Sequence, residues 1–244
     1  MLLILFIWGS LVSCSGIKTI PLEDDGKPES ECVILLHGMG RTKSSMDEIE
    51  EGLSKGGYNV VNFDYPSRKE TIEQIAENWI PKAIAQCPKS AEKVHFVTHS
   101  LGGIITRKYL QTNKLPSGSR IVMLSPPNQG SEVADYFKDT FWYRWFTGPV
   151  GQQLTTDSDS VPNQLAPIAY EVGVITGTRS FDPWFSILIP GTDDGKVSVE
   201  RAKLAEMKDF LTVPHTHTFI MNSDEVLRQI KCFLKKGYFD HTGR

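Results

Sequence analysis

Short apolar segments rich in β-forming residues alternate along this chain with segments of helical periodicity, and this alternation constrains the fold most. The first apolar segment reads Cys32-Val33-Ile34-Leu35-Leu36. A run without polar interruption is typical of a strand buried on both faces of a parallel sheet. The segments expected to form strands are residues 32–36, 58–63, 94–98, 121–124, 172–176 and 210–213. The alternation predicts an α/β fold with a mostly parallel central sheet and helices on both faces.

Helix signals lie between these segments. Capping boxes are expected at Ser45 with Glu48, where Gly56-Gly57 then supplies a stop, and at Ser67 with Glu70. Pro81 is expected to kink or shorten the second helix. A third helix is expected over residues 104–110, and residues 125–167 are expected to be irregular. Asn222 or Ser223 caps a closing helix that Gly237 terminates.

The bulk composition narrows the class of protein. The chain has 244 residues, is 40% hydrophobic and 23% charged, and carries a formal net charge of -3. This length is near the upper end for one hydrophobic core, so we expect a single domain. The charge gives no reason to expect a nucleic-acid partner, because binding phosphates requires a clustered basic surface.

The N-terminus differs from the rest of the chain. Residues 1–12 are almost wholly apolar and are followed by small residues. The run is too short to span a membrane, which takes about 20 apolar residues, and it is typical of a secretory signal. Leu11-Val12-Ser13-Cys14 resembles the bacterial lipoprotein box, in which the cysteine is lipidated and becomes the new N-terminus. A plain cleaved signal or a buried first strand is the alternative.

The cysteines limit the covalent cross-links. If Cys14 is lipidated, Cys32, Cys87 and Cys232 remain, so at most one disulfide forms. Cys32 opens an apolar run and Cys232 lies on an amphipathic helix face. We expect both to be small core residues.

A serine follows the third expected strand, in Thr98-His99-Ser100-Leu101-Gly102-Gly103. Ligands of parallel sheets bind at the carboxyl ends of the strands, and a sharp strand-to-helix turn would raise the hydroxyl above the sheet. H-S-L-G-G resembles the nucleophile elbow of α/β-hydrolase lipases and esterases, with Thr98 where the G-x-S-x-G motif has its first glycine. The resemblance implies Ser100 as the nucleophile. A glycine-rich turn that happens to contain serine is the alternative.

The loop His37-Gly38-Met39-Gly40 after the first strand resembles the H-G loop of lipases. That loop supplies half of the oxyanion hole, in which two backbone N–H groups stabilise the negative oxygen of the tetrahedral intermediate. The resemblance implies that these N–H groups belong to Met39 and Leu101. His37 is expected to hydrogen-bond within the loop.

The other two triad members should follow later strands in the order acid, then histidine. Gly191-Thr192-Asp193-Asp194-Gly195-Lys196-Val197 resembles the acid loop of lipases and favours Asp194, with Asp193 as the alternative. Pro214-His215-Thr216-His217 follows the last strand. His217 precedes an apolar run and is favoured as the general base over His215. An H-x-H pair can bind zinc, but no third ligand has suitable spacing, so no metal is expected.

Two further segments are expected near the substrate. Pro127-Asn128-Gln129-Gly130-Ser131 resembles a P-N-x-G-S/T loop that lines the site in lipase-like proteins. The aromatic segment Phe141 to Phe146, with Trp184-Phe185, forms either a lid or acyl-binding wall or an inserted helix packed on the sheet. The residues predicted to surround the substrate are His37, Gly38, His99, Asn128, Gln129, Trp142 and Trp145.

Together these motifs resemble compact bacterial lipases and esterases of the α/β-hydrolase superfamily, of the lipase class 2 or inositol-deacylase-like type. The resemblance covers roughly residues 31–236 and implies a serine hydrolase that cleaves small-molecule or lipid carboxylic esters through an acyl-enzyme, without a cofactor. An acyltransferase, thioesterase or amidase, or a binding lipoprotein on a degenerate hydrolase fold, is the alternative.

The expected organisation follows from these segments. Residues 1–14 form a signal, 15–30 a linker and 31–240 one hydrolase domain with an insertion around 131–167. The protein is expected to be exported, either periplasmic, secreted or anchored to the membrane through Cys14.

Overall fold

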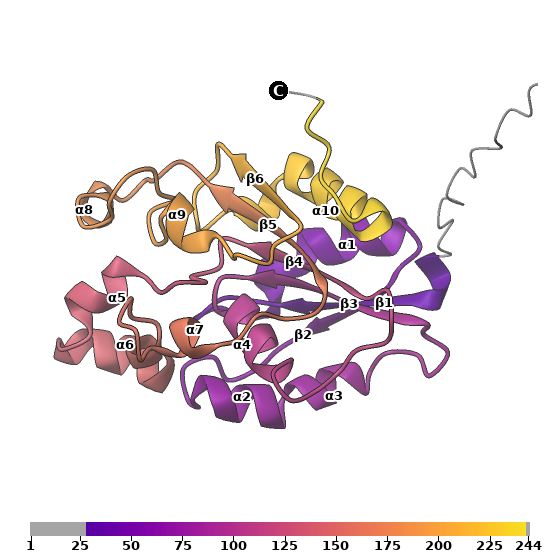
Figure 1. The fold of residues 1–244 in the computed structure, drawn as a ribbon, viewed down its shortest axis with the longest axis horizontal. Coiled ribbons are helices and arrows are strands. Elements are labelled where there is room, and N and C mark those ends of the chain that lie inside the picture. The colour runs from indigo at the N-terminus through magenta and orange to yellow at the C-terminus, as the bar shows by residue number, and fades with distance from the viewer. Residues whose placement is uncertain (1–27, 243–244) are drawn as a thin grey trace, which may run out of the picture.

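The computed structural model describes residues 28–242, which fold around a six-stranded parallel sheet of order β2-β1-β3-β4-β5-β6 (Figure 1). The strands are β1 (Glu31–Leu36), β2 (Asn59–Phe63), β3 (Lys93–His99), β4 (Arg120–Leu124), β5 (Glu171–Gly177) and β6 (Asp209–Val213). Each expected apolar segment therefore forms a strand, and the prediction of a mostly parallel sheet is confirmed.

Helices cover both faces of the sheet (Figure 1). One face carries α1 (Asp47–Lys55) and α10 (Asp224–Lys236), and the other carries α2 (Ile72–Asn78), α3 (Ile80–Ile84) and α4 (Leu101–Tyr109). The continuous apolar run of β1 serves both layers: Ile34 and Leu36 pack into the core beneath α2 and α4, and Leu35 packs into the core beneath α1 and α10. Burying each such side chain contributes roughly 1.5–3 kcal/mol.

Helix starts differ from the prediction where local capping signals compete. The capping box of α2 is formed by Thr71 and Gln74, so the helix begins after Thr71 and not at Ser67. Ser45 lies inside the short 3-10 helix Lys43–Met46, and α1 begins after Met46 without a side-chain cap. The effect expected of Pro81 is confirmed, because α2 ends at Asn78 and Pro81 lies in the first turn of α3.

The closing helix agrees with the prediction at both ends. The Ser223 side chain accepts a hydrogen bond from the Val226 N–H at the start of α10. Gly237 ends the helix with a φ of 76°, a left-handed conformation that glycine adopts without steric cost.

Residues 125–167 were expected to be irregular, but they contain α5 (Glu132–Phe137), α6 (Phe141–Gln153) and α7 (Val161–Gln164). Gly148 interrupts α6 with a φ of 63°, followed by Pro149, and these two residues mask the helical signal in the sequence. Together with α8 (Pro183–Ser186) and α9 (Val199–Ala202), these short helices lie at the carboxyl ends of the strands (Figure 1). The remaining 3-10 helices are Pro28–Ser30 and Ile220–Asn222.

A disulfide joins Cys32 of β1 to Cys87, which follows α3. The interpretation of Cys32 as a plain core residue was therefore wrong, because the fold brings together two cysteines that are 55 residues apart in sequence. Cys232 keeps a free thiol and is half-buried on α10. The limit of one disulfide holds for these cysteines.

The predicted signal at residues 1–14, including Cys14, and most of the predicted linker lie outside the described residues. Within residues 28–242, no helix combines the length and the hydropathy needed to cross a bilayer.

Candidate active site

Ser100 occupies a sharp turn between β3 and α4. Its φ of 52° and ψ of -119° lie in a region that residues with a side chain rarely adopt, and such strain is concentrated at functional sites. The turn is tight enough that a Cβ on Gly102 would lie 2.8 Å from the carbonyl oxygen of Leu36. The glycine therefore lets α4 approach β1 closely while the Ser100 side chain stays in a pocket above the sheet.

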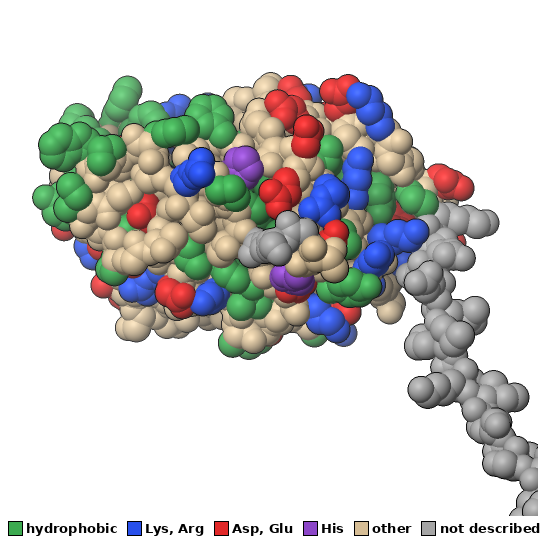
Figure 2. All heavy atoms as spheres, turned by 90° about the horizontal axis from the view of Figure 1, so that it is seen from above, with side chains coloured by type: hydrophobic (Ala, Val, Ile, Leu, Met, Phe, Trp, Pro, Cys, Tyr) green, Lys and Arg blue, Asp and Glu red, His purple; other side chains and the backbone are tan. Residues whose placement is uncertain are grey.

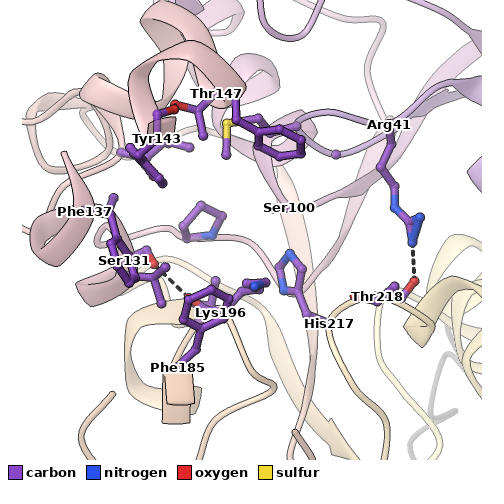
Figure 3. A pocket seen from close by; sticks show the side chains of 18 of the residues that line it. Arg41, Ser100, Ser131, Phe137, Tyr143, Thr147, Phe185, Lys196, His217 and Thr218 are labelled. Atoms are coloured by element: carbon purple, nitrogen blue, oxygen red, sulfur yellow. Dashed lines mark hydrogen bonds between the residues drawn. The ribbon is translucent and has the colours of Figure 1, made fainter. Parts of the chain in front are cut away.

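His217 and Asp194 are paired beside this turn. Nδ1 of His217 lies 2.9 Å from Oδ2 of Asp194, and the backbone N–H of His217 donates to the Asp194 carbonyl oxygen at 2.8 Å. Because Nδ1 carries the proton that the carboxylate accepts, Nε2 is left with a lone pair. Ser100 and His217 line the same pocket (Figure 3) but are not hydrogen-bonded to each other, and such contacts are often long before substrate binds.

The environment of Asp194 keeps it ionised although it is almost completely buried. Burial raises the pKa of Asp194, but the neighbouring His217, the Ser125 side chain and the N–H of Val197 outweigh this effect. The pKa of Asp194 therefore lies below its ordinary value. The N–H of Lys196 also donates to Oδ1 of Asp194, at 3.0 Å. A carboxylate held in this way fixes the imidazole ring and stabilises its protonated form.

The two alternative residues take different partners. Oδ1 of Asp193 accepts hydrogen bonds from Ser186 and from the Gly195 N–H, so it tightens its own loop. Nε2 of His215 bonds the hydroxyl of Ser223, the cap of α10, at 2.9 Å. Of the four candidates, the structure brings together only Asp194 and His217.

The two backbone N–H groups expected to form the oxyanion hole belong to Leu101 and Met39. Leu101 is the first residue of α4, where a helix leaves its N–H groups without an intrahelical acceptor. Met39 lies in the loop after β1 and lines the pocket. Among the described residues, no atom accepts a hydrogen bond from either N–H group.

The neighbours of these groups hold the loops together. His37 is fully buried, stacks on Tyr65 at 4.2 Å and bonds Asp64 and the Gly38 carbonyl oxygen, so it supports the loop as expected and does not line the pocket. Burial lowers its pKa. Gly38 lines the pocket, and a Cβ there would lie 2.7 Å from Nδ1 of His99.

His99 links the Ser100 turn to the His217 loop. Its Nε2 donates to the carbonyl oxygen of His217 at 2.9 Å, and its buried Nδ1 has no hydrogen-bond partner within residues 28–242. Burial, together with the charges of His217 and Arg41, lowers the pKa of His99 well below its ordinary value, so the ring is neutral.

Aromatic side chains line one side of the pocket (Figure 3). Trp142, Tyr143 and Phe146 of α6 line it together with Phe137 of α5 and Phe185 of α8. The helices that carry them also expose large hydrophobic side chains, among them Phe141 at 83% and Trp184 at 77%. Figure 2 shows hydrophobic side chains gathered at this end of the molecule.

Comparison with known proteins agrees with this architecture. The sequence matches the model of the α/β hydrolase family over residues 33–227, which is most of the chain. The chain belongs to the α/β-hydrolase family. No curated protein sequence matches it.

Solved structures of a lipase and of two esterases resemble this one at low sequence identity. The mature lipase BlEst2 of Bacillus licheniformis has a TM-score of 0.68 at 18% identity, and the match covers 85% of this chain and 93% of that one. A metagenomic carboxyl esterase has a TM-score of 0.61 at 16% identity, over 78% of this chain and 65% of that one. An esterase of Thermogutta terrifontis has a TM-score of 0.56 at 12% identity, and the match covers 85% of this chain and 90% of that one. These likenesses show the fold.

In this α/β-hydrolase, four residues predicted to surround the substrate do not line the pocket: the buried His37 described above, Asn128, Gln129 and Trp145. The buried Asn128 amide donates to the Ala202 carbonyl oxygen, and the Gln129 amide donates to the carbonyl oxygens of Glu200 and Lys203, so both hold the α9 segment in place. Trp145 lies on the outer side of α6 and is 77% exposed. His99 and Trp142 line the pocket as predicted.

Three polar residues of the site were not predicted from the sequence. Ser125 follows β4, has a φ of 48° and helps to lower the pKa of Asp194. Its position at the carboxyl end of a strand was the available signal. Arg41 and Lys196 both line the pocket, and each lies two residues beyond a residue that the motifs had singled out.

Proposed function

We propose that this α/β-hydrolase cleaves carboxylic esters with Ser100 as nucleophile, His217 as general base and Asp194 as the carboxylate that orients it. The observation that carries the proposal is the 2.9 Å bond from His217 Nδ1 to Asp194, in a pocket shared with a strained serine. This bond leaves the lone pair of Nε2 available for the hydroxyl proton of Ser100.

The reaction proceeds through an acyl-enzyme. His217 takes the proton from Ser100 as the hydroxyl oxygen attacks the ester carbonyl, and the N–H groups of Met39 and Leu101 stabilise the resulting oxyanion. Protonated His217 then gives its proton to the alcohol oxygen, and the alcohol leaves. Water, activated by His217, releases the acid and regenerates Ser100.

The test is hydrolysis of 4-nitrophenyl esters by the wild type and by Ser100→Ala, His217→Ala and His215→Ala. The first two variants should lose activity by about 10⁴-fold or more, because triad members act as a unit. His215→Ala is the matched control, since His215 bonds Ser223 and does not contact the pocket. A wild type that folds but is inactive on esters of every acyl length would contradict the proposal.

We also propose that the protein is exported and held at a membrane through Cys14. The apolar N-terminus and the motif at Cys14 support this, and the Cys32–Cys87 disulfide is compatible with an oxidising compartment. Radiolabelled palmitate should be incorporated by the wild type and not by Cys14→Ser. Wild-type protein that stays in the cytoplasm without label would overturn the proposal.

A further inference from the structure

Both charged side chains that line the pocket are cations. They are Arg41 and Lys196, and none of the lining residues is an Asp or a Glu. Asp194 does not line the pocket, and its carboxylate oxygens accept hydrogen bonds from His217 and from two N–H groups of its own loop. A ligand in this pocket therefore meets the cationic side chains of Arg41 and Lys196, and no carboxylate belongs to the residues that line it.

Arg41 is held in place without being neutralised. One of its guanidinium nitrogens donates to the carbonyl oxygen of Thr218 at 2.6 Å, directly after His217. Within the described part of the chain, Arg41 forms no ion pair. A guanidinium keeps further N–H donors in a planar fork, which matches the oxygens of a phosphate or carboxylate.

Lys196 is only weakly paired. Its Nζ lies 3.8 Å from Oδ2 of Asp182, at the limit of an ion pair, and 3.5 Å from the centre of the Phe185 ring. Burial lowers its pKa, and the carboxylates of Asp182 and Asp194 partly oppose this effect. The ammonium group thus lies against the Phe185 ring, where it has lost part of its hydration. An incoming anion could take the place of the lost water molecules.

The two cations flank His217, with Arg41 on one side and Lys196 on the other (Figure 3). In acyl transfer, His217 must reach the oxygen of the leaving alcohol in order to protonate it. Groups beside His217 therefore lie near the alcohol portion of the ester. The apolar side chains of Phe137, Tyr143 and Leu154 are left to contact the acyl chain.

We infer that the ester cleaved at Ser100 carries a phosphate or similar oxyanion on its alcohol portion, and that Arg41 and Lys196 bind this anion. The inference rests on the proposed function. Arg41 and Lys196 are thereby residues that determine specificity through substrate binding, and the aromatic part of the pocket receives the acyl group.

The test compares two esters with the same short acyl chain, 1-hexanoylglycerol and 1-hexanoylglycerol 3-phosphate. The wild type should have a kcat/KM at least about tenfold higher for the phosphate ester, because one charge contact in a partly desolvated site is worth this much. Arg41→Gln and Lys196→Gln should each lower this ratio severalfold or more, mainly by raising KM for the phosphate ester. Arg41→Lys should restore part of it.

A matched control and salt dependence separate specific binding from other effects. Lys114 is exposed on the loop between α4 and β4, at the opposite end of the sheet, so Lys114→Gln should leave the ratio unchanged. Raising the salt concentration should reduce the preference of the wild type, since ions screen partly exposed charges. Vesicles of phosphatidylglycerol, tested beside the soluble phosphate ester, then show whether the anion belongs to a membrane lipid or to a soluble ester.

The outcomes also distinguish the two proposals. If the wild type cleaves both hexanoyl esters equally well, or if Arg41→Gln lowers both rates by the same factor, this inference is overturned while the ester hydrolase stands. The second result would mean that Arg41 only supports the His217 loop. If neither ester nor any 4-nitrophenyl ester is cleaved, the proposed function itself fails.

Discussion

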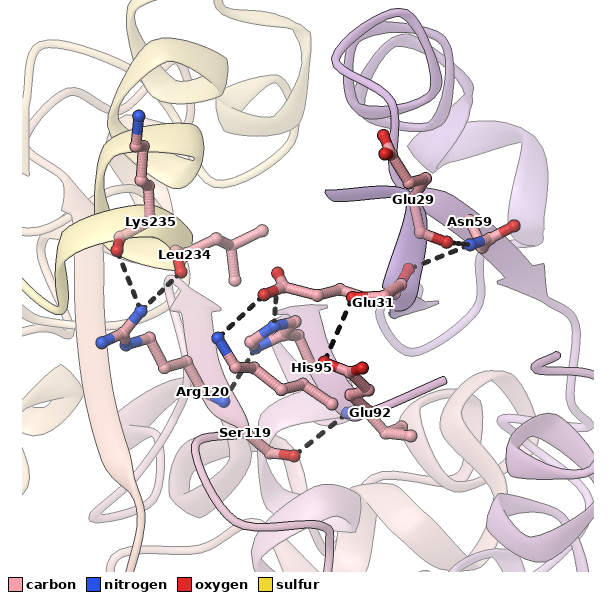
Figure 4. Close-up of polar contacts among 12 residues, drawn as sticks. Glu29, Glu31, Asn59, Glu92, His95, Ser119, Arg120, Leu234 and Lys235 are labelled. Carbon is pink, nitrogen blue, oxygen red and sulfur yellow. Dashed lines mark hydrogen bonds and ion pairs between the residues drawn. The ribbon is translucent and has the colours of Figure 1, made fainter. Parts of the chain in front are cut away.

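Two pairs of a carboxylate and an imidazole lie at opposite ends of the sheet. At the carboxyl ends of the strands, Asp194 bonds His217 at 2.9 Å. At the amino ends, Glu31 of β1 bonds His95 of β3 at 3.1 Å (Figure 4). The ammonium group of Lys93 also donates to the Glu31 carboxylate. In both pairs the carboxylate is buried.

The pairs differ in how the second ring nitrogen is used. Nδ1 of His95 accepts the backbone N–H of Arg120 at 2.9 Å, so its Nε2 carries the proton that Glu31 accepts, and the fully buried ring has no lone pair left. The tautomer of His217 is the reverse, with the proton on Nδ1 and the lone pair of Nε2 beside the pocket. The same chemical pair is therefore structural at one end of the sheet and suited to proton transfer at the other.

The largest expected effect comes from breaking the pair at the pocket. Asp194→Asn should lower kcat by about 10⁴-fold, because the amide favours the wrong tautomer of His217. Asp193→Asn is the matched control and should change kcat much less, since Asp193 bonds Ser186 and Gly195. Ester hydrolysis rates and circular dichroism measure both variants. Equal losses in the two would contradict the assignment of Asp194.

Breaking the other pair should affect stability and not the chemical step. Glu31→Leu removes the buried carboxylate that both His95 and Lys93 contact, and it should lower the free energy of unfolding by about 3 kcal/mol. Urea unfolding measures this change, and kcat per active site should stay close to the wild-type value. The double variant Glu31→Leu/His95→Phe should lose less than the sum of the single variants. Full additivity would mean that the two side chains are not coupled.

The smallest expected effect concerns pH. The pKa of Asp194 is lowered by its partners against the effect of burial, and so is that of Glu31, whose partners are His95 and Lys93. A lowered pKa contributes stability that is present above the unfolded-state pKa and is lost as the pH falls through the folded-state pKa. Below about pH 4, the free energy of unfolding should therefore fall more steeply for the wild type than for Asp194→Asn or Glu31→Gln. If the free energy of unfolding depended on pH in the same way for the wild type and the variants, the lowered pKa values of Asp194 and Glu31 would be contradicted.

Much of the fold could be predicted because local signals agree with the tertiary structure. The run at residues 32–36 lies between two helical layers. The Ser223 side chain caps the start of α10, and Gly237 ends it in a left-handed conformation. The start of α2 was missed because Ser67 and Thr71 both offer a capping box, whereas in the fold the Ser67 hydroxyl accepts the N–H of Gly40 and Thr71 caps the helix. The Cys32–Cys87 disulfide depends on contacts between distant segments, which spacing does not reveal.

The site was less predictable than the fold. Ordered motifs after successive strands pointed to Ser100, Asp194 and His217, and the structure brings Asp194 and His217 into contact. The orientation of Asn128 and the exposure of Trp145 could not be predicted, since both depend on how the short helices at the carboxyl end pack. The same holds for Arg41 and Lys196, whose importance comes from the absence of an acid in the pocket lining.

The most direct test of the central claim is to find which atom a serine-directed fluorophosphonate modifies. Ser131 also lines the pocket, but its hydroxyl donates to the Lys196 carbonyl oxygen at 2.8 Å, so it is the natural control. Peptide mass mapping of the labelled wild type should place the adduct on Ser100, with labelling lost in Ser100→Ala and kept in Ser131→Ala. An adduct on another serine, or no adduct on folded wild-type protein, would contradict the account.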